Sequence, residues 1–435
     1  MTARRAGLVM GIVALACPVA ASGQSRTAPR SAEFINAATG VSLDEAVQQA
    51  LRLAPPLREM RSEVDAARGM RVQAGLRPNP EVMLERRDAP TGMDAQTMAS
   101  VEWPLELGRR RARISAAERN IRAAELGVAD QERRLAAEVR TRYGAVLTGA
   151  RVLDVLADMV EVTRQQRDLV AARVDAGGAP AIERDALEIE LGRLEADLAL
   201  QTGRVRASVA EVRRIVAVPP DQPFVLRDTL EDVRRRMPPG APALRESGER
   251  SDLREARAQV AVADARVEQI RQEARPALKV FAGYMRMDNA FSQLGQTSAG
   301  TLEPVSGVFH YATGGVKFTL PFNRAQGDAQ AARAAQAGAQ AAVDAVSLTV
   351  DAERRAATAQ LEAAQAAVRV LETTRTRAKR LLDVVGQSYQ LGRGTLADVL
   401  AERRRYVDVE RAYVETAGAE YEAAVAMDVA MGGVR

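Results

Sequence analysis

The stretch Gly392-Arg393-Gly394 decides the fold, because it repeats a glycine turn that the chain has already made at Gly177-Gly178. Each turn follows a very long helical stretch, which itself follows two short strand-like runs that end at a proline, Pro104 or Pro321. The offsets agree, since 392 − 177 = 215 and 321 − 104 = 217, about half of the 435 residues. Duplication on this scale indicates two repeats, each with two strands and two long helices.

The long helical stretches are too extended for a compact globule. From Leu107 to Ala176 there is no proline, and glycine is sparse. About 65 residues at about 1.5 Å each give a helix about 100 Å long, and such helices persist only in coiled coils or bundles. The second half repeats the pattern from Ala325 to Tyr389, and a return helix follows each turn.

The chain is therefore expected to have five parts. In order, these are a signal peptide (1–23), an extended N-terminal segment (24–40), a first repeat (41–218), a Pro/Gly-rich connector (219–248) and a second repeat (249–435). The repeats have β-hairpins at 79–105 and 277–320 and tip turns at 176–180 and 391–395. Ser42 and Glu45 predict a capping box at the start of the first helix.

The N-terminus has the pattern of a secretory signal. Arg4 and Arg5 precede an apolar run from Ala6 to Ala16, and small residues follow up to Gly23. The run is shorter than the roughly 20 residues that a membrane-spanning helix needs. Cleavage after Gly23 removes Cys17, the one cysteine of the chain; acylation of Cys17 in a lipoprotein processing box is the alternative.

The composition excludes several classes of function. Aromatic residues make up 3% of the chain against 47% hydrophobic residues, which favours long alanine-rich helices over a bulky core. Without the two leader arginines the formal charge is 59 − 57 = +2, so no nucleic-acid binding is expected. His310 is the only histidine and lies in a strand pattern, so neither a Ser-His-Asp triad nor a His metal site can form within one chain. The sequence predicts no enzyme, no cofactor and no bound metal.

The number of strands predicts an oligomer. Strands of about ten residues are long enough to cross a bilayer when tilted. The alternation suits two environments, with Leu278, Val280, Ala282 and Tyr284 on one side, while Lys279 and Phe281 begin the other. An open sheet edge is not tolerated in lipid, and the smallest membrane barrels have about eight strands. Several chains must therefore pool their strands, and three chains of four strands would supply twelve.

Four segments, in order on this duplicated frame, carry a family resemblance. They are Ser42-Leu43-Asp44-Glu45-Ala46, Gly75-Leu76-Arg77-Pro78-Asn79-Pro80, Leu107-Gly108-Arg109-Arg110-Arg111 and Tyr389-Gln390-Leu391-Gly392-Arg393-Gly394-Thr395-Leu396-Ala397-Asp398-Val399-Leu400. Together they resemble the outer-membrane efflux protein family, of which the TolC channel is the best-known member. The resemblance covers nearly all of the mature chain.

The resemblance implies a mainly α fold with a small β part, a TolC-like trimeric α/β-barrel. In this arrangement a homotrimer forms a twelve-stranded barrel in outer-membrane lipid, and long coiled-coil helices form a tunnel in the periplasm. It also implies docking to a periplasmic adaptor (membrane fusion) protein and to an inner-membrane RND pump.

The resemblance also assigns residues at the tips. Asp398 falls where family members place an aspartate at the aperture, and Glu183 and Tyr389 match an acid and a tyrosine that can hydrogen-bond to each other. The alternative is that Glu183 and Asp398 are ordinary helix N-terminal acids, favoured by the helix dipole.

The chain departs from the family at two tip positions. The second aperture acid of the prototype is Ala401 here, and the arginine of the gating network is Gly394, with Arg393 next to it. The resemblance implies adaptor docking at the turn glycines, which are Gly177, Gly178, Gly392 and Gly394. Alternatively, these are simply the glycines that any tight helix–helix turn favours.

Three other features have a structural interpretation. Arg109-Arg110-Arg111 and Arg403-Arg404-Arg405 are expected on solvated helix faces or in salt bridges between helices, rather than as phosphate grips. Trp103 lies at a strand end, where it would serve either in an interfacial aromatic belt or as a core or loop anchor.

The function indicated is the outer-membrane channel of a tripartite efflux system. The segments Pro78-Asn79-Pro80 and Glu106-Leu107-Gly108-Arg109-Arg110 look most like the heavy-metal (CzcC-like) branch, yet no Cys or His cluster could bind a soft metal. Both metal cations and drugs therefore stay open as cargo. The main alternative is a periplasmic coiled-coil adaptor, which would have one helical hairpin and compact β domains. The leader opposes a cytosolic coiled-coil scaffold.

Overall fold

The computed structural model describes residues 30–90, 94–236, 249–296, 298–320, 322 and 325–433. The predicted signal peptide, Cys17 and residues 237–248 of the connector lie outside the described residues. The elements, in chain order, are the 3₁₀ helix η1 (Arg30–Glu33), α1 (Leu43–Leu53), α2 (Pro55–Gly75), β1 (Glu81–Asp88), β2 (Asp94–Leu105), α3 (Arg109–Asp175), α4 (Ala181–Ile215), α5 (Leu230–Arg236), α6 (Ser251–Glu273), β3 (Ala277–Gln296), β4 (Leu302–Thr319), α7 (Gln326–Gln390) and α8 (Leu396–Ala430).

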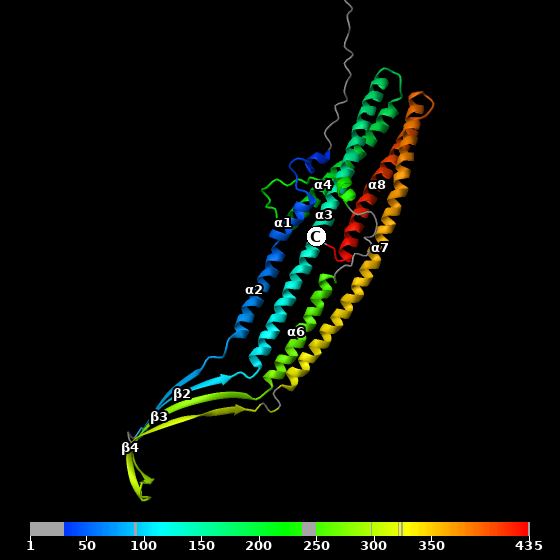
Figure 1. The fold of residues 1–435 in the computed structure, drawn as a ribbon. Helices are drawn as coiled ribbons and strands as arrows, with labels where there is room; N and C mark the ends of the chain where they lie inside the picture. Colours follow the sequence, from blue (N-terminus) through cyan, green and yellow to red (C-terminus); the bar gives the residue numbers. More distant parts are fainter. Residues whose placement is uncertain are drawn as a thin grey trace, which may run out of the picture.

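The molecule is elongated, with the turns of both helical hairpins at one end and the sheet at the other (Figure 1). Helices α3 and α7 have 67 and 65 residues, which corresponds to about 100 Å each and confirms the predicted length. The shorter helices α2 and α6 pack beside the parts of α3 and α7 that lie nearer the sheet. Among the described residues, no helix is both long enough and apolar enough to cross a membrane.

The duplication is residue for residue at the tip end. Helices α4 and α8 both have 35 residues, and their limits differ by the same offset, since 396 − 181 = 215 and 430 − 215 = 215. The long helices also end in step, at Asp175 and Gln390, with 390 − 175 = 215. An offset of 215 therefore assigns each residue of α4 an equivalent in α8.

The sheet has the order β1-β2-β3-β4, antiparallel throughout. The register places Val280 between Trp103 and Val316, and Leu278 between Leu105 and Phe318, so one face of the sheet is apolar and exposed. On the opposite face, Glu102 forms ion pairs with Lys279 and Lys317. The alternation predicted for β3 is confirmed.

The second hairpin is longer than its sequence pattern indicates. Strands β3 and β4 have 20 and 18 residues instead of about ten, whereas β1 and β2 have 8 and 12. The pairing continues past a register shift between Asn289 and Gln293, because a bulge lets the ladder resume beyond the irregular residues.

The expected N-terminal segment and connector pack together on the middle of α3. Ile35 and Val41 both bridge to Leu226, and α5 forms within the expected connector. The hydroxyl of Tyr143 on α3 donates to the Val41 carbonyl and to Asp228, at 2.9 Å in each case. The capping box of Ser42 and Glu45 is present as predicted.

Helix α2 begins at its two prolines. Pro55 and Pro56 occupy the first turn, where a helix has no use for the missing backbone N–H. Helix α1 ends at Leu53, and Ala54 alone separates it from these prolines.

Candidate functional site at the helical tips

Both helical hairpins turn in the same way. Gly177 N–H donates to the Val174 carbonyl and Gly178 N–H to the Arg173 carbonyl, at 2.9 and 2.7 Å. In the second repeat the equivalent bonds run from Gly392 to Tyr389 and from Arg393 to Ser388, at 3.0 and 2.9 Å. This double pattern is the Schellman motif, which satisfies the last carbonyls of a helix.

In each turn, only one residue has a backbone conformation that favours glycine. Gly177 and Gly392 have φ values of 74° and 71°, in the left-handed region. Gly178 and Gly394 have no such φ, so a positive φ explains the glycine at only one position of each turn. A Cβ at Gly394 would lie 3.4 Å from the Ser388 hydroxyl, which is ordinary contact.

Glu183 and Asp398 occupy equivalent positions, since 398 − 183 = 215. Each is the third residue of its return helix. Asp398 accepts hydrogen bonds from the hydroxyl and the backbone N–H of Thr395, at 2.6 and 3.1 Å, in a capping box. These bonds hold the pKa of the exposed Asp398 carboxyl below its ordinary value.

Glu183 has no such partner at the start of its own helix, because the N-cap of α4 is Pro180. Its carboxylate instead accepts a 2.7 Å hydrogen bond from the hydroxyl of Tyr389, which lies at the end of α7. At this equivalent position, the acid of the second repeat therefore accepts hydrogen bonds within its own hairpin, whereas the acid of the first repeat accepts one from the other hairpin.

Tyr389 is half-buried between the two tips. Burial is the main influence that raises the pKa of its hydroxyl, and the hydrogen bond to the Glu183 carboxylate raises it further. The guanidinium of Arg173 opposes this shift, so a cation of α3 lies close to the pair. No sequence signal pointed to Arg173.

An apolar cluster lies directly behind the Tyr389–Glu183 pair. It combines both repeats, and its buried members are Val170, Leu187, Leu396 and Leu400. Tyr389 packs against this cluster. The tips are therefore held together by apolar contact as well as by the hydrogen bond.

A second polar contact joins the hairpins one heptad further along α4. Glu190 is only 1% exposed and accepts from Arg404 of α8 at 2.6 Å and from Arg193 of α4 at 2.8 Å. Burial opposes ionisation of Glu190, yet the two arginines outweigh it and leave the pKa of this carboxyl below its ordinary value. Neighbouring Arg403 is buried, and it donates to Thr163 and Gln166 of α3.

The structure divides the two arginine runs among several roles. Arg404 forms the expected salt bridge between helices, but Arg403 is 7% exposed, so a solvated face is wrong for it. Arg109 donates to the carbonyls of Gln272 and Glu273 at the end of α6. Arg110 likewise donates to the carbonyl of Gly75 at the end of α2. These arginines cap helix C-termini, which is the polarity that a helix dipole favours.

The remaining predicted residues take simple positions. Trp103 lies on the apolar sheet face, 42% exposed, and its indole N–H donates to the Pro78 carbonyl, so it also anchors the loop after α2. His310 lies in β4 as expected, and its ring stacks on Tyr284. Arg393 is exposed at the turn. No group of three or more His, Cys, Asp or Glu residues is placed to hold a metal in the part of the chain that the structure describes.

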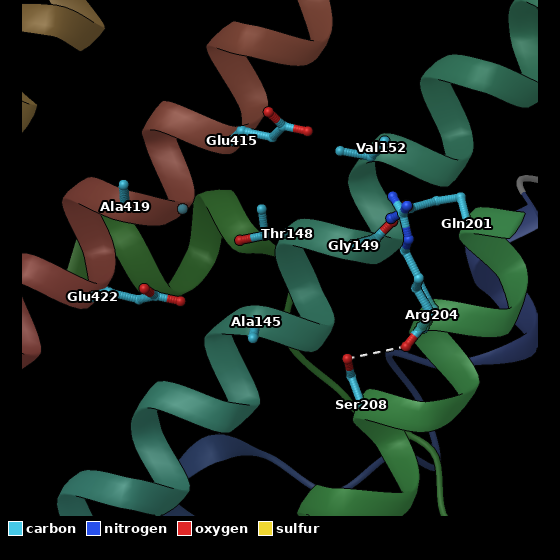
Figure 2. A pocket seen from close by; sticks show the side chains of 12 residues that line it. Ala145, Thr148, Gly149, Val152, Gln201, Arg204, Ser208, Glu415, Ala419 and Glu422 are labelled. Atoms are coloured by element: carbon cyan, nitrogen blue, oxygen red, sulfur yellow. Dashed lines mark hydrogen bonds between the residues drawn. The ribbon is translucent and has the colours of Figure 1, made fainter. Parts of the chain in front are cut away.

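A groove of about 280 Å³ lies where α4 and α8 flank α3 (Figure 2). Thr148 and Val152 of α3 form its floor, and Arg204 and Glu415 stand on opposite sides. Val152 is nine residues, or two and a half turns, from Tyr143. The groove therefore lies on the face of α3 away from α1 and α5.

These features define the class of protein. A duplicated pair of very long helical hairpins, continued by a small antiparallel sheet, is the TolC-like channel fold. The chain matches the family model described as outer membrane efflux protein over residues 46–218 and 246–433, and it belongs to this family. This membership argues against a periplasmic adaptor and against a cytosolic scaffold.

Individual relatives agree with this assignment. The chain is 25% identical over 437 residues to the cobalt-zinc-cadmium resistance protein CzcC of Cupriavidus metallidurans, covering 99% of this chain and 100% of that protein. Its fold is similar to that of CusC, with a TM-score of 0.71 at 15% identity over 91% of this chain and 93% of that one. A membrane protein from Pseudomonas aeruginosa gives a TM-score of 0.69 at 18% identity, covering 94% and 98% of the two chains.

Proposed function

We propose that this chain is the outer-membrane channel of a tripartite efflux system, a passive conduit from the periplasm to the exterior. The observation that carries the proposal is a sheet with one exposed apolar face, continued directly by helices about 100 Å long. The apolar face, with Trp103 at its rim, suits contact with membrane lipid. The helices are long enough to form a tunnel through the periplasm.

The proposed active form of the protein is a homotrimer in the outer membrane. In the part of the chain that the structure describes, four strands form an open sheet whose edge strands, β1 and β4, each have one unpaired side. Such edges are not tolerated in lipid, so the sheets of neighbouring copies would join edge to edge.

The tips would form the periplasmic aperture. Asp398 would line it, so three copies would place three carboxylates around one axis and attract cations. The Tyr389–Glu183 hydrogen bond would hold the two hairpins of each chain together and limit opening. The turns at Gly177-Gly178 and Gly392-Arg393-Gly394 would dock the periplasmic adaptor, which links the channel to an inner-membrane RND pump.

The proposed cargo is a heavy-metal cation. The similarity to a protein named for cobalt, zinc and cadmium resistance, over nearly the full length of both chains, supports this choice. A passive conduit needs acidic residues along its path rather than a binding cluster of soft ligands, and Asp398 supplies such a charge.

The test is deletion of the gene in the source bacterium, followed by complementation. The proposal expects lower tolerance to cobalt, zinc or cadmium, restored by the wild-type gene, and the protein in the outer-membrane fraction. Unchanged metal tolerance with increased drug sensitivity would replace metal ions by drugs as cargo. A soluble periplasmic location would contradict the channel itself.

A further inference from the structure

The sheet face opposite the apolar one is the face that would line the lumen of the proposed channel. The inner walls of membrane barrels are usually polar. On this face Glu102 pairs with Lys279 and Lys317, and Glu85 pairs with Arg87 at 3.4 Å. Among the described residues of the same face there are also four methionines, which a polar wall does not predict.

The strand register places three of these methionines next to one another. Met98 of β2 is the direct partner of Met285 of β3, and directly opposite residues have Cβ atoms about 4.5–5.5 Å apart. Met287 follows two residues further along β3, about 7 Å away on the same face. It is also the diagonal neighbour of Met98, at a separation of about 7–8 Å that long side chains bridge. Three flexible thioethers, all half-buried, therefore share one patch.

The sulfur of Met287 is turned toward the neighbouring strand. Gln96 of β2 is the direct partner of Met287, and its amide Nε2 donates to the Met287 Sδ at 3.0 Å. Gln96 and Met98 lie on the same face of β2. The sulfur is therefore on the side of β3 where Met98 stands, and its lone pairs already face a polar partner.

A fourth methionine extends the patch to β1. Met83 is the partner of Ser100 on β2, which makes it the diagonal neighbour of Met98, and its side chain is 47% exposed. The thioethers thus form a staircase across three strands, from Met83 through Met98 and Met285 to Met287.

Filling gaps in an apolar core is the ordinary role of methionine, and Met427 shows it. Met427 is 1% exposed and packs in an apolar cluster that joins α7 to α8. Met98, Met285 and Met287 lie instead on the open, largely polar face of the sheet. Core packing therefore does not explain this group.

We propose that Met98, Met285 and Met287 bind a soft monovalent metal cation, Cu(I) or Ag(I), on the lumen face of the sheet. Thioethers are soft ligands that favour such ions, whereas carboxylates, carbonyls and water suit Mg(II) and Mn(II). Binding replaces water on the ion by thioether sulfurs, and no electron or proton is transferred. The inference names a class of cargo for the proposed conduit, and it rests on that proposal for the placement of this face in the lumen.

The site would select among cargo ions without blocking the conduit. Conduction requires binding that is favourable enough for an ion to enter and weak enough for it to leave. Met83 offers the ion a neighbouring thioether, and Glu85, the direct partner of Met98 on β1, adds a carboxylate beside the site. The sheet lies at the opposite end of the molecule from the tips, so this selection is separate from the charge of Asp398 (Figure 1).

Silver binding to the full-length protein, purified in detergent, tests the site. Ag(I) in chloride-free buffer is the probe because it keeps its oxidation state in air. Isothermal titration calorimetry should give one Ag(I) per chain, and X-ray absorption of the bound silver should show sulfur neighbours. On either expectation for Cys17, removal with the leader or acylation, no free thiol competes for the ion.

The decisive variant is Met98→Leu with Met285→Leu. Leucine keeps the volume and the apolar character of methionine, so folding should be preserved, but two of the three sulfurs are lost. Removal of a group that merely supports a ligand costs about 10–100-fold in metal affinity, so the double variant should bind Ag(I) at least about tenfold more weakly.

Two controls accompany this variant. Met70→Leu changes a methionine of α2 that is 63% exposed and away from the sheet, and it should leave Ag(I) binding unchanged. An excess of Mg(II), which prefers oxygen ligands, should not displace bound Ag(I).

The outcomes separate the site from the channel. Weaker binding in the double variant, with Met70→Leu unchanged, supports the site. Equal binding in the wild type and the double variant, or none in the wild type, overturns it and makes these methionines an apolar lining only, while channels recorded from the same protein in planar bilayers leave the conduit standing. Silver binding by a wild-type protein that forms no channels supports the site and overturns the conduit.

Discussion

The hydroxyl of Tyr389 donates a 2.7 Å hydrogen bond to the carboxylate of Glu183, and it thereby joins the tips of two hairpins that lie half a chain apart in sequence. The residue equivalent to Tyr389 in the first repeat is Val174, since 389 − 215 = 174. The contact is therefore made once per chain and breaks the internal symmetry of the duplication.

Loss of this hydrogen bond should loosen the tips. Tyr389→Phe keeps the ring against the apolar cluster and removes only the donor. A hydrogen bond to a charged group at a partly exposed site contributes about 1 kcal/mol, so the closed-to-open ratio should fall about fivefold. Single-channel conductance in planar bilayers should rise accordingly. Tyr406→Phe, on α8 and away from the tips, is the matched control and should leave conductance unchanged; an equal rise there would remove the specific role of Tyr389.

The charge of Asp398 should persist to low pH. The hydrogen bonds from Thr395 lower the pKa of Asp398 in the folded protein below the unfolded pKa of about 3.9. The carboxylate therefore keeps its charge above the unfolded pKa and loses it only as pH falls through the lower folded pKa. Block of conductance by divalent cations should therefore be constant from about pH 7 to pH 5 and weaken only in stronger acid.

Two substitutions check that prediction. Asp398→Asn keeps a side chain that can bond to Thr395 but removes the charge, so block should be weak at every pH. Ala401→Asp adds an acid at the position where the family prototype has its second aperture carboxylate, and block should be stronger. If Asp398→Asn responds to divalent cations like the wild type, Asp398 is a helix cap and not an aperture residue.

The Glu190–Arg404 contact should act as a second restraint between the hairpins. Glu190→Gln keeps the size of the side chain but loses the ion pairs with Arg193 and Arg404. Because Glu190 is buried, the cost should be about 1–3 kcal/mol of local stability. Limited proteolysis at the tips should be faster in this variant. Glu402→Gln, which breaks an exposed pair with Arg405, is the control and should have little effect.

The backbone of Ala217 is strained, whereas the equivalent residue of the second repeat is a glycine. Ala217 has a φ of 58°, in the turn that ends α4. The equivalent residue in the second repeat is Gly432, since 432 − 217 = 215, and it has a φ of 79°. A left-handed alanine costs about 1–2 kcal/mol, partly offset by the greater chain entropy of glycine, so Ala217→Gly should stabilise by about 0.5–1 kcal/mol. The thermal midpoint by circular dichroism should rise by about 1–2 °C. Gly432→Ala should lower it; a fall in both variants would contradict this account.

Much of this fold could be predicted because its signals are local and repeated. Glycine turns, proline stops and the long proline-free stretches gave both hairpins, and alternation gave the two faces of β3. The offset of 215 also makes Glu183 and Asp398 equivalent, although the family resemblance, and not the offset, singled out these residues.

The rest depends on contacts between distant segments. Nothing local distinguishes Arg403, which is buried against Thr163, from Arg405, which is exposed. The capping of α6 by Arg109 requires knowledge that α3 begins where α6 ends. Similarly, Leu226 joins Ile35 and Val41 only because the expected connector folds back on α3.

The central claim is that the chain forms a channel whose conductance is set by contacts between its two hairpin tips. Its most direct test is single-channel conductance of the full-length protein in planar bilayers, wild type beside the double variant Tyr389→Phe with Glu190→Gln. The account predicts small, cation-selective channels for the wild type and a larger conductance for the double variant than for either single one. Absence of channels from the wild type, or equal conductance in all four proteins, would contradict it.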